Sequence, residues 1–125
     1  MGIFVYQTDT TIKASTFIDS DVDIIVSNIV SVIFRNYVNI GAYLTIEEKY
    51  SPHELLFTRT LVGNVLTTKR YYDSAEVAST VKSEFDVIYA DNTLHMNDTG
   101  SADLFEFNYS IYEITDEEFT TLLLK

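Results

Sequence analysis

The sequence has no cysteine and no tryptophan, and it has a single proline and only four glycines among 125 residues. Without cysteine the chain has no disulfides, thiolate metal sites, iron–sulfur clusters or cysteine nucleophiles, and the redox compartment stays undetermined. The glycines, at positions 2, 41, 63 and 100, are too scattered for a phosphate-binding loop. Two histidines, His53 and His95, cannot build a histidine-rich zinc site within one subunit. We therefore expect no cofactor and no metal.

Basic residues are also scarce, since 8 Lys and Arg stand against 19 Asp and Glu, for a net charge of −11. Residues 1–72 carry seven acidic and six basic residues, whereas residues 73–125 carry twelve acidic residues with only Lys82 and Lys125. Such a negative field repels phosphates, so we expect no direct nucleic-acid binding and no binding to anionic membrane surfaces. It permits a basic partner, although a plain acidic, solvated surface is the commoner interpretation.

No long hydrophobic run is present. The longest apolar stretch, from Val22 to Val38, includes Asp23 and Arg35 and is too short and too polar to span a bilayer. The N-terminus has no basic segment before its apolar residues, so it does not resemble a signal peptide. We expect no transmembrane segment, and a protein that is cytoplasmic or incorporated in a particle.

Hydrophobic residues are abundant at 46%, with nine Tyr and eight Phe, so a packed core is available. At 125 residues the chain matches the commonest size of one domain and is too short for two separate cores. We interpret residues 1–125 as a single domain.

The first half of the chain mixes strand and helix signals. Ile3–Thr8 and Thr11–Ile18 read as two strands of a hairpin that turns at Asp9-Thr10. Apolar residues at helical spacing predict a helix that begins after an N-cap at Ser20, although its β-branched residues also fit a strand. A short strand over Ile40–Ile46 and a polar connection over Glu47–His53 are then expected.

The clearest hairpin joins Leu55–Val62 to Val65–Tyr72 through Gly63-Asn64, a pair suited to a type I′ or II′ turn. A two-residue turn places Val62 opposite Val65, Leu61 opposite Leu66 and Arg59 opposite Thr68.

After this hairpin, Asp73 with Glu76 three residues later predicts a capped helix that ends near Glu84. A strand over Phe85–Ala90 and a polar loop over Asp91–Asp103 are expected to follow it.

The end of the chain has the most regular pattern. Leu104–Ile114 alternates with a period of two, which predicts one face of Phe105, Phe107, Tyr109 and Ile111. Thr115 and Glu118 then form a capping box before a short helix. Because hairpins outnumber crossover units, we predict an α+β fold with a mostly antiparallel sheet built from hairpins and two or three helices packed on one face.

Motifs that carry chemistry are weak. Asp98-Thr99-Gly100-Ser101 resembles the signature of aspartic proteases, but the resemblance covers four residues and no later glycine follows, so we interpret it as a polar turn. His53-Glu54 lacks the second histidine of a zincin helix, and the chain has no Gly-x-Ser-x-Gly elbow. The acidic loop Asp91–Asp103 offers oxygen ligands for calcium without the spacing of an EF-hand.

Two groups of residues are candidates for partner binding. Arg59, Lys69 and Arg70 form a basic cluster on the central hairpin that could bind an anion or an acidic partner, or could balance acidic neighbours. The apolar face of the C-terminal helix, with Phe119, Leu122 and Leu123, could dock onto a partner or pack on its own domain.

We therefore expect a non-enzymatic structural or assembly subunit that docks onto copies of itself, as a homo-oligomer, or onto a larger protein particle. The near-neutral and acidic halves of the chain suit head-to-tail contacts, and a viral or phage particle is one home for such a subunit. The alternative is an acidic inhibitor or nucleic-acid mimic that blocks a basic groove of a partner. An enzyme with dispersed carboxylates and a small-ligand binder rank below both.

Overall fold

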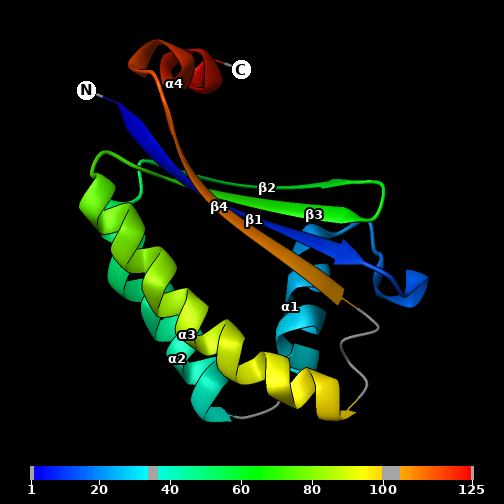
Figure 1. The fold of residues 1–125 in the computed structure, drawn as a ribbon. Helices are drawn as coiled ribbons and strands as arrows, with labels where there is room; N and C mark the ends of the chain where they lie inside the picture. The colour runs from blue at the N-terminus through cyan, green and yellow to red at the C-terminus, as the bar shows by residue number, and fades with distance from the viewer. Residues whose placement is uncertain (1, 34–36, 100–104, 125) are drawn as a thin grey trace.

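The computed structural model describes the backbone of residues 2–33, 37–99 and 105–124, and the side chains of residues 2–16, 18–27, 41–87 and 105–124. Short 3₁₀ helices cover Ser15–Phe17 and Ser51–His53. The longer elements follow one another along the chain (Figure 1) as β1 (Ile3–Ile12), α1 (Val22–Ile33), α2 (Tyr37–Tyr50), β2 (Leu56–Val62), β3 (Val65–Tyr72), α3 (Ala75–Thr99), β4 (Phe105–Ile114) and α4 (Asp116–Leu123).

The strands form one antiparallel sheet in the order β2-β3-β1-β4. β1 lies in its interior, where it pairs with β4 along its whole length and with β3 along most of it. The α+β class and the antiparallel sheet are confirmed. Among the described strands, one pair, β2 and β3, forms a tight hairpin, because α1, α2 and α3 separate the other strands in sequence.

The predicted first hairpin is wrong, because β1 continues through Asp9 and Thr10 without a turn. The Asp9 carboxylate accepts hydrogen bonds from Gln7 Nε2 at 3.0 Å and from Thr67 Oγ1 at 2.9 Å, and Thr10 is buried. Partners on both sides of β1 therefore override the turn preference of Asp9.

The hairpin of β2 and β3 is confirmed together with its register. Val62 lies opposite Val65, Leu61 opposite Leu66, and Arg59 opposite Thr68. Gly63 has a φ of +62°, and Asn64 has no positive φ. A positive φ at the first central position alone is the geometry of a type II′ turn.

The helix predicted over the apolar stretch Val22–Val38 is confirmed as α1 for residues 22–33, where the strand alternative is wrong. Tyr37 and Val38 belong to the next helix, α2. The N-cap of α1 is Asp21 in place of Ser20, since Asp21 Oδ1 accepts the hydrogen bond of the Asp23 backbone N–H at 2.9 Å.

The predicted strand over Ile40–Ile46 and the polar connection over Glu47–His53 are also wrong. Residues up to Tyr50 belong to α2, and residues 51–53 form the second 3₁₀ helix. Tyr43, Ile46 and Tyr50 are buried at spacings of three and four residues, so one apolar helical face decided the structure against the strand preference of the β-branched residues.

α3 is longer than predicted, and the strand over Phe85–Ala90 is wrong. Ser74 takes the capping role expected of Asp73, since its Oγ accepts the Val77 N–H at 3.3 Å. Ala78, Val81 and Phe85 are buried on one continuous helical face, which carries the helix past Glu84. Within the expected loop Asp91–Asp103, residues 91–99 are helical and residues 100–103 lie outside the described residues.

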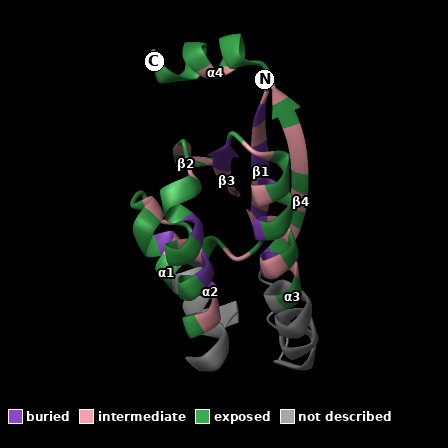
Figure 2. Cartoon of the chain, turned by 90° about the vertical axis from the view of Figure 1, so that its left-hand side faces the viewer, coloured by how far each residue is buried: buried purple, intermediate pink, exposed green. Residues whose placement is uncertain are grey.

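α1, α2 and α3 lie on one face of the sheet, and the main core fills the space between (Figures 1 and 2). The rings of Tyr6 and Phe85 stack at 5.9 Å, and those of Tyr43 and Phe85 lie 5.3 Å apart. The predicted inner face of β4 is confirmed. The four residues of this face contribute to the main core, namely Phe105, Phe107, Tyr109 and Ile111.

The opposite face of the sheet carries a smaller cluster of buried residues, Ile3, Val5 and Tyr71. Among the described elements only α4 packs there, through Phe119, at one end of the sheet. Figure 2 shows α4 apart from the other helices and mostly exposed. The candidate site lies on this face of the sheet, beside α4.

Candidate docking surface

α4 begins directly after β4 because its capping box is complete. Thr115 Oγ1 accepts the Glu118 N–H at 3.0 Å, and Glu118 Oε1 accepts the Thr115 N–H at 3.1 Å. Asp116, Glu117 and Glu118 fill the first turn, where negative charge is favoured by the helix dipole. The predicted capping box and C-terminal helix are confirmed.

Phe119 attaches α4 to the sheet. Its ring lies 5.7 Å from the ring of Tyr71, and it packs against the cluster of Ile3, Val5 and Tyr71. Of the predicted docking residues, Phe119 is therefore engaged within its own domain.

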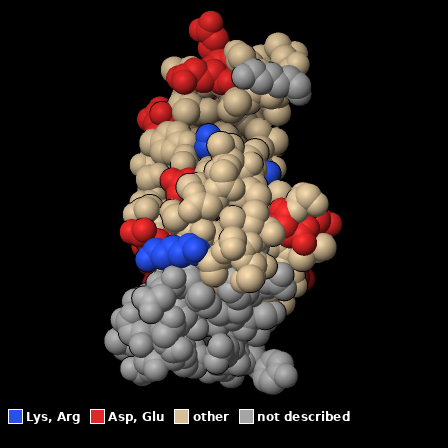
Figure 3. Space-filling model, turned by 90° about the vertical axis from the view of Figure 1, so that its right-hand side faces the viewer, with Lys and Arg blue, Asp and Glu red and all other residues tan. Residues whose placement is uncertain are grey.

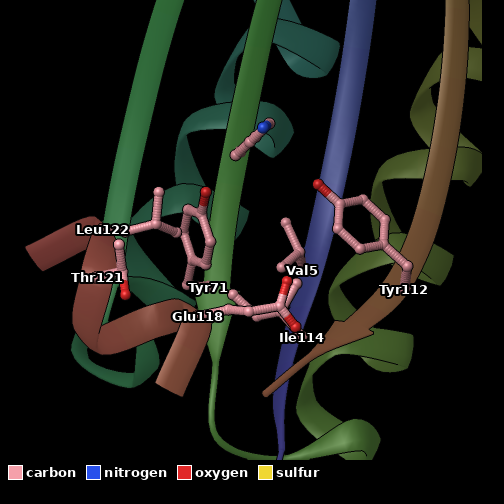
Figure 4. Close-up of a pocket in the computed structure, with 8 residues that line it drawn as sticks. Val5, Tyr71, Tyr112, Ile114, Glu118, Thr121 and Leu122 are labelled. Atoms are coloured by element: carbon pink, nitrogen blue, oxygen red, sulfur yellow. The ribbon is translucent and has the colours of Figure 1, made fainter. Parts of the chain in front are cut away.

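Beside Phe119, α4 and the sheet leave an open groove of about 420 Å³, which we call the α4 groove. Figure 4 shows Leu122 and Tyr71 on one side of it and Tyr112 on the other, with Val5 between them. Most of the lining is apolar or aromatic, and the polar members lie among it. The residues that line the groove are Val5, Lys69, Tyr71, Tyr112, Ile114, Glu118, Thr121 and Leu122.

The two tyrosines in the α4 groove present neutral, fixed walls. Tyr112 donates its hydroxyl hydrogen to Gln7 Oε1 at 2.7 Å. Burial raises the pKa of Tyr71, and burial together with the charges of Tyr71 and Asp9 raises the pKa of Tyr112. Both hydroxyls therefore stay protonated at neutral pH, and the walls of the groove attract apolar groups.

Exposed leucines continue from the groove to the end of α4. Leu122 is 37% exposed, Leu123 is 55% exposed and Leu124 is 83% exposed. Leu122 lines the groove, whereas Leu123 does not. The sequence prediction named Leu122 and Leu123 but missed Leu124, which the same run of leucines could have indicated.

The three predicted basic residues do not share one surface. Arg59 and Arg70 lie on the helix-covered side of the sheet, and Lys69 lines the α4 groove on the other side. Successive residues of a strand point to opposite faces, which separates Lys69 from Arg70. Arg59 and Arg70 of the predicted basic cluster therefore share one face of the sheet, and Lys69 lies on the other.

Arg70 is an internal residue, with 6% of its side chain exposed. Its guanidinium binds Glu47 at 2.9 Å and Glu54 at 3.0 Å, and it lies over the rings of Phe57 and Phe85 at 4.7 and 5.2 Å. Burial disfavours its charge, but Tyr43 and the two carboxylates outweigh that effect and raise the pKa of Arg70. Arg70 therefore balances acidic neighbours within the chain itself.

Arg59 extends the same cluster. Its guanidinium lies 3.6 Å from Glu47 and 4.6 Å from the centre of the Phe57 ring. Glu47 therefore joins two arginines, and the missed acidic partners are Glu47 and Glu54. Their sequence separation from β3 hides this contact from any local pattern.

No group of three His, Asp or Glu side chains able to hold a metal ion occurs among the described residues. His53 is exposed, with its ring 6.3 Å from that of Tyr50. The side chains of His95, Asp98 and Thr99 lie outside the described set, as do Gly100 and Ser101 entirely. The protease-like motif and the calcium hypothesis therefore acquire no supporting geometry.

The described acidic side chains on one side of the molecule do not form a single patch (Figure 3). Figure 3 shows one side of the molecule, where acidic side chains gather in several separate groups with uncharged surface between them. Within the described part of the chain, no helix combines the length and the apolar character needed to cross a membrane.

Comparisons with protein-family models, curated proteins and solved structures find no match for this chain. Its function has to be argued from the site itself.

Proposed function

We propose that the protein is a non-enzymatic subunit that docks onto other protein surfaces, either copies of itself or a larger particle. The α4 groove and the leucines beside it are the docking surface. The single observation that carries this proposal is an apolar groove beside three leucines that the domain leaves exposed, Leu122, Leu123 and Leu124.

The exposure of these leucines has an energetic meaning. Removing apolar surface from water contributes about 25 cal/mol per Å². Isolated exposed apolar residues are ordinary, but a contiguous group beside a hollow is typical of a surface that a partner covers. Because Leu123 and Leu124 are mostly exposed, their burial in the fold contributes little to its stability, and a partner could bury most of their remaining surface.

The acidic inhibitor is the second candidate, favoured by the net charge of −11. A mimic of nucleic acid needs its carboxylates in a continuous array. On the side shown in Figure 3, the described acidic side chains form separate groups and no continuous array, which supports docking over mimicry for that side.

The mass of the complex in the cells that produce the protein tests this proposal. We expect the tagged wild-type protein to sediment from a native extract well above its monomer mass of 14.3 kDa. Leu122→Gln places a polar group in the groove and shifts the protein toward monomer, as read by sedimentation and circular dichroism together. Val87→Gln, at an exposed apolar position on α3, is the matched control and leaves the complex intact.

A wild-type protein that sediments as a monomer in the extract contradicts the proposal. So does a complex that survives Leu122→Gln but dissociates with Val87→Gln, because docking would then occur on α3.

A further inference from the structure

Most of the described basic side chains already form ion pairs inside the chain. Arg59 and Arg70 bind Glu47 and Glu54, Lys49 lies 3.3 Å from Glu84, and Lys82 lies 2.6 Å from Asp86. Among the described basic side chains, Lys13 and Lys69 remain outside these ion pairs. A second copy therefore brings a charge of −11 to any contact and, among its described residues, few available cations.

The surroundings of the α4 groove are acidic. Asp116, Glu117 and Glu118 occupy the first turn of α4, and Glu118 also lines the groove. Lys69 is the one cation among the residues that line the groove. Like charges that meet across an interface are unfavourable, whereas a basic partner would find complementary charge here.

The size of the groove indicates what it can hold. Its volume of about 420 Å³ accepts a few apolar side chains, and α4 beside it has 8 residues, a length of about 12 Å. An amphipathic helix presents apolar anchors at spacings of three and four residues, which two turns can place along such a hollow.

We propose that the α4 groove binds a basic amphipathic helix of a different protein, and not a second copy of this chain. Leucine-like anchors of that helix occupy the hollow between Leu122 and Tyr112, and its lysines or arginines face the acidic first turn of α4. This inference rests on the proposed docking function and names the chemistry of the partner.

A synthetic peptide can test the inference on the purified full chain. The probe is an 18-residue amphipathic helix of leucine and lysine with one tryptophan on its apolar face. Because the protein has no tryptophan, selective excitation of tryptophan beyond the tyrosine absorption band reports the environment of the peptide alone. We expect a blue shift that saturates, and that weakens when salt rises from 50 to 500 mM. The same peptide with glutamate for lysine is expected not to bind.

Three variants then locate the binding site, because we expect them to change the affinity for the peptide in different directions. Glu117→Gln weakens binding about two- to fivefold, whereas Glu76→Gln, which removes an exposed acid from the first turn of α3, leaves it unchanged. Lys69→Gln strengthens binding about twofold because it removes a like charge from the groove. Equal effects of Glu117→Gln and Glu76→Gln would mean that the peptide follows net charge alone, which overturns the inference.

Sedimentation of the purified protein without peptide separates this inference from the proposed function. We expect a monomer at 100 µM in 150 mM salt. A dimer that Leu122→Gln dissociates would overturn the basic-helix inference, while the docking function would stand. Monomeric behaviour of the wild-type protein in the native extract would instead contradict the docking function itself.

Discussion

Replacing Arg70 by methionine tests how the helices are held to the sheet. Arg70→Met keeps much of the aliphatic stem but removes the guanidinium that lies between Phe57 and Phe85 and binds Glu47 and Glu54. The two carboxylates then lose their principal counter-charge while Glu54 stays mostly buried.

The expected cost follows from that arrangement. Removing one partner of a buried ion pair costs about 3–5 kcal/mol, because the other charge is left buried and uncompensated. For a domain of this length that loss lowers the melting temperature by roughly 10–20 °C. Thermal unfolding followed by circular dichroism measures it.

Two further variants make the test specific. Lys69→Met changes the adjacent residue on the opposite face, which makes no ion pair with a described residue, and should change stability by less than about 0.5 kcal/mol. Adding Glu54→Gln to Arg70→Met should recover part of the loss, because Glu47 still has Arg59 as its partner and no carboxylate then remains unpaired. A cost of Arg70→Met no larger than that of Lys69→Met, or a double variant that is the least stable of all, would refute this explanation.

Two more predictions concern the turn and the buried tyrosines. Gly63→Ala should destabilise the fold by about 1–2 kcal/mol, because alanine is strained at a φ of +62°. Gly41→Ala should stabilise it by about 0.5–1 kcal/mol, because alanine favours the interior of a helix such as α2. Urea unfolding of both variants measures the two opposite changes in the free energy of unfolding. Burial, with smaller contributions from neighbouring charges, raises the pKa of Tyr6 to about 12 from 10. Stability should therefore be unaffected by this group below pH 10 and should fall by about 2–3 kcal/mol as the pH rises from 10 to 12, because the unfolded chain loses the proton first. Tyr6→Phe should reduce the alkaline loss of stability without abolishing it, because burial also raises the pKa of other tyrosines such as Tyr72 and Tyr109; an unchanged slope would contradict the role of Tyr6.

Sequence patterns predicted the elements whose partners are close in the chain. The turn at Gly63 set the register of β2 and β3, strict alternation set the inner face of β4, and the capping box at Thr115 set the start of α4. In each case the deciding interaction joins residues a few positions apart, or a face that a single strand displays.

The wrong predictions concern segments whose deciding contacts join residues that are distant in the sequence. Asp9 looked like a turn residue because its hydrogen-bond partner Thr67 is distant in sequence. α2 and the second half of α3 contain short stretches that fit strands, and their helical faces emerge only where Tyr43 and Phe85 meet in the core. Arg70 looked available to partners because Glu47 and Glu54 lie on other elements. Tertiary contacts decided these cases.

Only part of the candidate docking surface could be predicted from the sequence. Phe119, Leu122 and Leu123 could be named from helical spacing alone. The α4 groove itself needs Val5, Tyr71 and Tyr112 from three different strands, which only the sheet order brings together.

Side-chain footprinting of the native complex tests the central claim most directly. In the complex isolated from the producing cells, hydroxyl-radical labelling should be reduced at Leu122, Leu124 and Ile114 relative to the isolated protein. Val62 and Val87 are also highly exposed apolar residues outside the groove and should stay as reactive as before. Protection of Val62 or Val87 together with unchanged labelling at Leu122 would contradict docking through the α4 groove.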